Sequence, residues 1–420
     1  MSQTTETDEL EIELYIFISD YLEHNMIEYH DPSFHDNLVN LATNEYFEMC
    51  ISINIYETID DYEDAYPFIH HKIDKLVREY LKWLNISRRQ YLNPRQHHYH
   101  KYADKIKTRI DKIRASYQPA QRTPEWYTFR NNLVTASNIW KIFGSGANYN
   151  SLICEKCRPE ILFDDIADFR SVNTESSLHW GVKYEPLSTA IYEYRNKCVI
   201  GQFGCIQHPR IPCLGASPDG IVVSPDSPDY GVMLEIKNVV NREITGVPSM
   251  AYWIQMQIQM EVCDLEDCNF VETQFKEYAE PATTADDDAE TKFYAGIPNY
   301  LYNGVILYFV KRDFVDSSPK YVYMPLNIPL NKQNIEAWIS EQKRDIADTH
   351  VLFKRIYWYC ERFSCVLVKR NRDWFAAAEP RIIDFWKMVE KERVTGHEHR
   401  LPKKRPPKLS AGCVIKLLDI

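Results

Sequence analysis

The stretch Gly215–Asn238, GASPDGIVVSPDSPDYGVMLEIKN, carries polar residues that a simple buried hairpin does not need. Asp219 stands in a tight Pro-Asp-Gly turn directly before an apolar strand, and Glu235 and Lys237 interrupt a second apolar run further on. Side chains two residues apart in a strand point to the same face. The spacing therefore predicts that Glu235 and Lys237 project side by side, while their neighbours pack on the other face.

A hairpin through the connecting segment SPDSPDYG would bring Asp219 close to Glu235. Two hard carboxylates that meet in this way make a Mg²⁺ site. The adjacent ammonium of Lys237 can lower the pKa of an attacking water or stabilise charge that develops on a phosphate. Glu185, on a preceding helix, is a candidate third carboxylate. An Asp followed by Glu-x-Lys also fits an ion pair at a sheet edge beside an ordinary turn residue, because such spacings are common.

Five motifs in order between Trp126 and Gln257 are more specific than this pair alone. They read WYTFRNNLVTAS, WGVKYEP, SPDG, LEIK and YWIQMQ. In content and order they resemble the lambda-exonuclease and YqaJ-like viral recombinase family of PD-(D/E)xK nucleases. The resemblance implies an α/β fold with a central mixed β-sheet flanked by helices, of the restriction-endonuclease-like kind. It also implies a large DNA virus as the source, and a looser likeness reaches Val394.

The resemblance assigns roles to the residues of the predicted metal centre. Asp219 and Glu235 would bind two Mg²⁺ ions, which Mn²⁺ can replace, with the main-chain carbonyl of Ile236 as a further ligand. Glu185 would contribute directly or through a metal-bound water. Lys237 would position or activate the water that attacks the phosphodiester.

The resemblance also implies a helper group for the water and a pocket for the end of the DNA. Gln255 would orient the attacking water with support from Tyr252, although Tyr252 equally fits simple core packing. Arg130 and Ser137, with help from Thr135, resemble the family's pocket for a 5′-phosphate. A planar guanidinium suits a terminal phosphate, but Arg130 also fits an ordinary charge on a helix surface.

Four other residues near the motifs receive non-catalytic interpretations. Gln257 and Gln259 alternate with methionines, and we expect them to be polar-face residues of their helix. His179 is expected to cap or pack at a helix start. Pro186 directly follows the candidate acid and is costly inside a helix, which predicts a helix start or a kink there.

The family resemblance predicts a metal-dependent deoxyribonuclease. The expected activity is 5′-to-3′ digestion of linear double-stranded DNA, which leaves a 3′ single strand for recombination, repair or genome processing. The resemblance also implies a toroidal homotrimer around the DNA. Two alternatives stay open: an endonuclease or flap or single-strand nuclease with the same metal centre, and a non-catalytic DNA-binding scaffold.

Charge is distributed unevenly along the 420 residues, which carry a net charge of −11. Residues 1–71 contain 17 Asp and Glu but no Lys or Arg, whereas residues 72–117 contain 13 Lys and Arg against 4 acids. Apolar residues at helical spacing predict helices through most of this region. The basic helix faces fit either a solvated surface or contact with phosphates. The acidic part fits a solvated face, DNA mimicry or recruitment of a basic partner such as a single-strand-annealing protein.

The length and the 45% hydrophobic content predict two or three domains with real cores. We expect a helical domain over 1–117, a nuclease core over 118–395 and a basic tail over 396–420. An acidic, small-residue insertion at about 279–291 predicts a mobile loop, and helices near 331–358 and 376–393 close the core. The tail motif RLPKKRPPK fits a nuclear-import address, a DNA tether or a solvated terminus.

Targeting and cysteine patterns complete the expectations. The acidic N-terminus lacks a basic n-region, and no apolar run reaches the ~18 residues that span a bilayer. We therefore expect an intracellular protein without a membrane partner, in the cytoplasm at a viral replication site or in the nucleus. The eleven cysteines predict reduced thiols. Cys154 and Cys157 have ligand-like spacing, but no second such pair exists to complete a zinc site.

Overall fold

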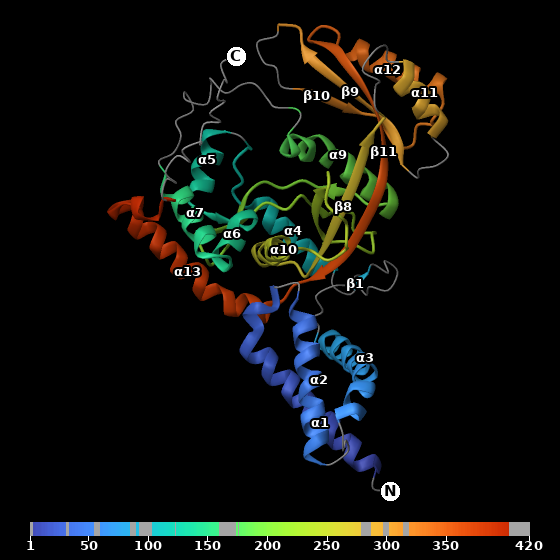
Figure 1. Cartoon of the computed structure of the whole chain (residues 1–420). Coiled ribbons are helices and arrows are strands. Elements are labelled where there is room, and N and C mark those ends of the chain that lie inside the picture. The colour runs from blue at the N-terminus through green and yellow to red at the C-terminus, as the bar shows by residue number, and fades with distance from the viewer. Residues whose placement is uncertain are drawn as a thin grey trace, which may run out of the picture.

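The computed structural model describes residues 3–30, 33–53, 59–84, 90–91, 103–121, 123–158, 174, 176–278, 287–296, 302–313 and 319–402. A mixed sheet flanked by helices forms the body, and a helical arm precedes it (Figure 1). This architecture confirms the predicted fold class.

One sheet of eight strands spans the body in the order β10-β9-β11-β8-β7-β6-β3, with β1 paired to β11. Its strands are β1 (Gln90–Tyr91), β3 (Ile200–Gly201), β6 (Gly220–Val222), β7 (Met233–Asn238), β8 (Asp267–Glu277), β9 (Asn303–Lys311), β10 (Lys320–Tyr323) and β11 (His350–Lys369). Strand β7 runs parallel to β8, and the other neighbours in this sheet are antiparallel. A smaller sheet joins β2 (Val134–Thr135), β5 (Leu214–Ala216) and β4 (Ile206–Gln207).

Helices cover the sheet and join its strands. Those of the body are α4 (Ala103–Ala115), α5 (Pro124–Asn131), α6 (Ala136–Phe143), α7 (Gly146–Cys157), α9 (Ser177–Asn196), α10 (Met250–Cys263), α11 (Asp287–Gly296), α12 (Lys332–Asp345), α13 (Arg372–Thr395) and η5 (Glu398–Arg400). None of the helices in the described ranges combines the length and apolar character that crossing a membrane requires.

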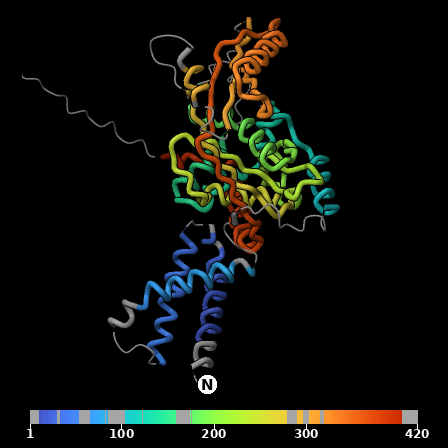
Figure 2. The backbone as a smooth tube through the Cα atoms, turned by 90° about the vertical axis from the view of Figure 1, so that its right-hand side faces the viewer, coloured from blue at the N-terminus to red at the C-terminus, as the bar shows by residue number. Residues whose placement is uncertain are grey.

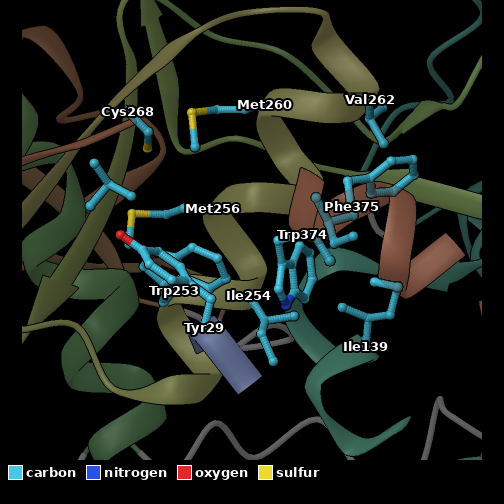
Figure 3. Packing of buried hydrophobic residues seen from close by; sticks show 14 of the residues in the cluster. Tyr29, Ile139, Trp253, Ile254, Met256, Met260, Val262, Cys268, Trp374 and Phe375 are labelled. Carbon is cyan, nitrogen blue, oxygen red and sulfur yellow. The ribbon is translucent and has the colours of Figure 1, made fainter. Parts of the chain in front are cut away.

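Helix α10 lies at the centre of the largest apolar core. It connects the parallel strands β7 and β8, and most of its circumference is buried, which is why its sequence is apolar on nearly every side. The indole of Trp253 packs edge-on against that of Trp374, with 5.2 Å between the ring centroids. It also packs, at a tilt, against the ring of Tyr29, with 5.6 Å between the centroids (Figure 3). These contacts tie α10 to both α13 and the arm.

The arm contains α1 (Gln3–Asn25), η1 (Met26–His30), α2 (Phe34–Ser52) and α3 (Ile59–Trp83). It extends away from the body (Figures 1 and 2), with the single turn η1 at the junction. The helical expectation holds for these segments, but residues 90–91 form a strand on β11 instead. Helix α4 packs against the body, where Arg109 pairs with Asp264 at 3.0 Å. The division into a helical domain up to residue 117 and a nuclease core from residue 118 stays a prediction.

The expected helix over 331–358 is wrong beyond Asp345. From His350 the chain forms β11, which pairs with β9 along its first half and with β8 along its second. Aromatic and β-branched residues dominate β11, and cross-strand packing favours such residues in strands. Strand β11 thus joins β8, in the middle of the sheet, to the outer part of the body, which is formed by β9, β10, α11 and α12 (Figure 1).

Two further expectations fall partly outside the described residues. Residues 279–286 of the acidic insertion and residues 403–420 of the basic tail lie there. From Asp287 onward the insertion is helix α11. Arg400, the first basic residue of the tail, is bound in the body, because its Nε donates to both carboxylate oxygens of Glu392, at 2.7 and 2.6 Å.

Candidate active site

The hairpin of β6 and β7 forms as the sequence predicts. Gly220 pairs with Leu234, so the turn that carries Asp219 lies beside β7. Asp219 Oδ2 accepts the main-chain N–H of Ile236 at 2.7 Å. This bond fixes the carboxylate next to the strand that carries the Glu-x-Lys pair.

Glu235 and Lys237 form an ion pair at the floor of the site. Glu235 is fully buried, and its Oε1 contacts the ammonium of Lys237. Its Oε2 accepts the side-chain amide of Gln259 at 2.7 Å, and the same amide donates to the carbonyl of Ser217 at 3.2 Å. Both oxygens of Glu235 therefore have a fixed direction.

The pKa shifts follow from two buried acidic groups that stand beside one ammonium. Burial, together with the Glu235 carboxylate, raises the pKa of Asp219 well above its ordinary value. Burial acts to lower the pKa of Lys237, but the two carboxylates outweigh it and the pKa is raised. One ammonium does not balance two acids, so the pocket favours a further cation.

Glu185 lies on α9 at the edge of this group. Burial of its carboxyl by surrounding protein and the charge of Glu235 raise its pKa, and Lys237 opposes them. The residue is exposed, so water screens these effects. Within the described ranges, no three His, Cys, Asp or Glu side chains stand close enough to hold a metal ion together. The structure thus joins Asp219 to the Glu235–Lys237 pair and leaves Glu185 at the rim.

Gln259 is the glutamine that contacts Glu235, and the expectation that it lies on a polar face is wrong. Asp219 and Glu235 are called the acidic pair below. Gln259 and Gln257 are both buried. Gln257 is structural, since it accepts the N–H of Asn371 at 2.7 Å and donates to the carbonyl of Lys369 at 2.9 Å. Gln255 is half-buried one turn before Gln259. The four-residue spacing of these two glutamines was the signal available in the sequence.

The donor set suits a hard divalent cation. Asp219 and Glu235 offer carboxylate oxygens, each with more than one lone pair, so their present hydrogen bonds leave room for a metal ligand. Gln259 Oε1 is buried and, within the described residues, has no hydrogen-bond partner. A buried unpaired acceptor beside acidic groups fits an ordered water of a hydrated ion. The residues present therefore fit a magnesium or manganese site.

A second layer of charge lies beside Lys237. Lys237 Nζ stands 5.0 Å from the ring centroid of Tyr252, and the guanidinium of Arg242 stands 5.6 Å from the same ring. Arg242 also pairs with Glu272, which lies opposite Lys237 in the register of β7 and β8. Tyr252 therefore packs on Lys237, and Arg242 is a cation near the candidate site that the motifs did not indicate.

The predicted phosphate pocket lies where α5, β2 and α6 meet. Arg130 is in the last turn of α5, with its guanidinium 4.6 Å from the ring of Trp126. Thr135 caps α6, and its hydroxyl lies 3.3 Å from that of Ser137 in the first turn. Helix N-termini attract anions, which agrees with a phosphate here.

The pocket adjoins the acidic pair through Ser217. Burial raises the pKa of the Cys205 thiol, while Arg130 and the Ser217 hydroxyl lower it, which places both groups beside this sulfur. The carbonyl of Ser217 accepts from Gln259, the partner of Glu235. One short chain of contacts therefore links Arg130 to the candidate metal site.

Lys156, buried behind the pocket, predicts a pH dependence of stability. Burial lowers its pKa to about 8, Glu155 opposes this, and Arg130 and Arg393 add to it. Because the unfolded chain keeps the ordinary value of 10.5, it binds more protons between these pH values, and stability rises with pH there. We expect Lys156→Met to remove up to about 3 kcal/mol of this rise in urea unfolding.

Lys387→Met, at an exposed position of α13, is the matched control for this measurement. Its unfolding free energy should follow that of the unmodified protein at each pH. The unfolding free energy of Lys156→Met could instead run parallel to that of the unmodified protein from pH about 8 to about 10.5. That result would show that the buried ammonium does not titrate in this window.

Comparison with known proteins shows what this part of the chain is similar to. A family model described as the YqaJ-like viral recombinase domain matches residues 125–266. The uncharacterized protein R354 of Acanthamoeba polyphaga mimivirus is 25% identical over 307 residues, which cover 67% of this chain and 54% of that protein. The chain thus spans about half the length of the curated relative it matches.

Two solved structures share part of the arrangement. An alkaline exonuclease, LHK-Exo, from Laribacter hongkongensis has 19% identity and a TM-score of 0.36 over 64% of this chain and 94% of its own. A phage related exonuclease from Haemophilus somnus 129PT has 12% identity and a TM-score of 0.31 over 62% and 94%. The family match covers the predicted phosphate pocket and the two carboxylates Asp219 and Glu235. Residues 125–266 of the chain are thus similar to the YqaJ-like viral recombinase domain.

Proposed function

We propose that the chain is a divalent-metal-dependent DNA nuclease that digests linear duplex DNA from 5′-phosphorylated ends in the 5′-to-3′ direction. The observation that carries the proposal is the joint placement of Asp219, Glu235 and Lys237 on one hairpin of a YqaJ-like domain. The product would be a 3′ single strand for recombination or repair. A ring of three subunits stays a prediction from the family resemblance, and an annealing partner stays a prediction from the acidic residues 1–71.

The metal would be held by the acidic pair. Asp219 and Glu235 would bind Mg²⁺, with Glu185 and the carbonyl of Ile236 completing the set for a second ion, and Mn²⁺ would substitute. When bound, the ions supply Lewis acidity that activates water and neutralises phosphate oxygens.

The protein side chains would then direct the hydrolysis. A water attacks the phosphorus in line, its new O–P bond forms, and the P–O3′ bond breaks. The leaving O3′ takes up a proton and becomes the 3′-hydroxyl of the released nucleotide, and the shortened strand keeps a new 5′-phosphate. Lys237 holds its proton at Nζ and stabilises charge on the phosphate, since its pKa is raised. Gln259 keeps the Glu235 carboxylate in one orientation. Gln255, on the same face of α10, is proposed to orient the water.

The substrate experiment compares four DNA molecules with Mg²⁺: linear duplex with and without a 5′-phosphate, a nicked circle and a covalently closed circle. We expect fast digestion of the phosphorylated linear duplex and none of the closed circle. Cleavage of the closed circle at the rate of the linear DNA would identify an endonuclease. Binding without products from any of the four would identify a scaffold.

Arg130→Ala tests the phosphate pocket separately from the metal site. A hydrogen bond to a charged group contributes about 1.5–3 kcal/mol, so the preference for phosphorylated ends should fall about tenfold to a hundredfold. The measurement is the ratio of rates on phosphorylated and unphosphorylated ends. Arg381→Ala, at an exposed position 5.8 Å from Phe143 of α6, should keep this ratio. An equal loss on both ends in Arg130→Ala would contradict the pocket assignment.

A further inference from the structure

Helix α9 contains a proline directly after Glu185. Pro186 lies inside the helix, where the sequence predicted a start or a kink. Proline has no N–H to donate to the carbonyl of Val182, four residues earlier, and its ring crowds that carbonyl. The turn that presents Glu185 thus lacks one of the backbone bonds that normally hold a helix rigid.

Side chains from two strands bind the carbonyls on either side of Val182. Asn238 Nδ2 donates to the carbonyl of Gly181 at 3.0 Å, and the Tyr323 hydroxyl donates to the carbonyl of Lys183 at 2.6 Å. The two donors come from β7 and β10. The weakened turn is therefore tied at both edges to the sheet that α9 covers (Figure 1).

Asn238 is itself held by a buried network. Its Oδ1 accepts the hydroxyls of Ser188 at 2.6 Å and Thr273 at 2.8 Å, and these two hydroxyls lie 2.8 Å apart. Both residues are fully buried. Because a satisfied buried network has one preferred geometry, the amide of Asn238 is aimed at α9. Asn238 also directly follows Lys237 in β7, and alternation places the two on opposite faces.

Tyr323 approaches Glu185 as well as the helix backbone. Burial, followed by the charges of Tyr321 and Glu185, raises the pKa of the Tyr323 hydroxyl. The hydroxyl thus keeps its proton and stays a donor at neutral and mildly alkaline pH. Thr189 adds a further bond, since its hydroxyl donates to the carbonyl of Glu185 at 3.0 Å.

We propose that Asn238 and Tyr323 are positioning residues that hold the Pro186 turn of α9 and thereby aim the Glu185 carboxylate at the Glu235–Lys237 pair. Their hydrogen bonds from the sheet hold the helix turn in place where the proline removes a backbone hydrogen bond. The role rests on the proposed nuclease function, because aiming Glu185 matters only if that carboxylate serves the metal centre. It assigns to both residues an effect on metal binding that packing alone does not produce.

The test uses Tyr323→Phe, which removes one oxygen, in the full chain. The readouts are the Mn²⁺ concentration that gives half-maximal hydrolysis, the Kd for Mn²⁺ by calorimetry, and the melting temperature. Loss of a group that orients a metal ligand lowers metal affinity about tenfold to a hundredfold, and we expect a rise of this size in both metal readouts. Tyr308→Phe, on the same sheet face, should leave both unchanged.

Two more variants separate positioning from structural support. Pro186→Ala restores the N–H, so Tyr323→Phe combined with Pro186→Ala should need less Mn²⁺ than Tyr323→Phe alone. Asn238→Asp keeps the acceptor for the two hydroxyls but loses the donor to Gly181. Its added negative charge by itself favours a cation, so a higher Mn²⁺ requirement in Asn238→Asp would come from lost positioning.

Three results would overturn the proposal. The first is an unchanged Mn²⁺ requirement in Tyr323→Phe, with or without a lower melting temperature. The second is an unchanged or lower requirement in Asn238→Asp. The third is no relief by Pro186→Ala. If the unmodified protein hydrolyses no DNA but binds Mn²⁺, the nuclease function fails, while the calorimetric comparison still tests the positioning role.

Discussion

Asp219→Asn is expected to abolish DNA hydrolysis and, at the same time, to raise the melting temperature of the metal-free protein. Activity should fall at least ~10³-fold, because a neutral amide replaces a carboxylate ligand of the metal. Stability should rise because burial and the Glu235 carboxylate raise the pKa of Asp219, so its ionised form destabilises the fold at neutral pH. For 420 residues that unfold together, a gain of about 1 kcal/mol corresponds to a melting temperature about 1 °C higher.

The sign of this effect changes with pH and with metal. A raised pKa in the folded state means that stability is lost as pH rises above the ordinary value of 3.8. The difference between Asp219→Asn and the unmodified protein should therefore shrink as pH falls toward that value. Added Mn²⁺ should stabilise the unmodified protein and leave the variant unchanged. Asp226→Asn, exposed in the same hairpin, is the control, and a lower melting temperature in Asp219→Asn alone would contradict the electrostatic account.

Lys237→Met is expected to lose activity as well but to shift stability in the opposite direction. Removal of a group that stabilises or moves charge lowers the rate about 10²–10⁴-fold. Without the ammonium, the buried Glu235 keeps only the amide donor of Gln259. Breaking a buried ion pair costs about 3–5 kcal/mol, and because Lys237 is 24% exposed we expect about 2–4 kcal/mol in metal-free unfolding.

The pH profile of Lys237→Met follows from the raised lysine pKa. The pair stabilises the fold below the ordinary value of 10.5 and loses this effect as pH rises through the folded-state pKa. The deficit of the variant should be constant at neutral pH and shrink only in strong alkali. The control for a surface lysine is Lys276→Met, because Lys276 on β8 pairs with Glu361 on β11. Equal unfolding free energies for Lys237→Met and the unmodified protein would show that Glu235 does not depend on its ammonium.

Local pattern was sufficient for the parts of the fold that local pattern determines. Alternation of polar and apolar residues around Glu235, together with the Pro-Asp-Gly turn, correctly predicted the hairpin that meets Asp219. Strand β11 was missed where its first residues, from His350, continue a helical-looking stretch. Its pairing with β9 on one side and β8 on the other is tertiary, and such pairing overrides local helical periodicity.

The same distinction applies to the candidate site. The motifs indicated Gln255, yet Gln259 reaches Glu235, because the closeness of α10 to β7 selects one of two glutamines on the same helix face. Tyr323 and Asn238 carry no motif at all. Their donors meet α9 only after β10 and β7 have joined the sheet, so sequence spacing gives no signal for them.

The most direct measurement is anomalous diffraction from crystals of the protein soaked with Mn²⁺. We expect a peak between Asp219 and Glu235, about 2.1 Å from an oxygen of each, with the ammonium of Lys237 nearby. The same crystals of Asp219→Asn should lack it. Strong Mn²⁺ peaks elsewhere, without a peak at Asp219 and Glu235 and with these two carboxylates turned away from each other, would contradict the proposal that this hairpin is the catalytic centre.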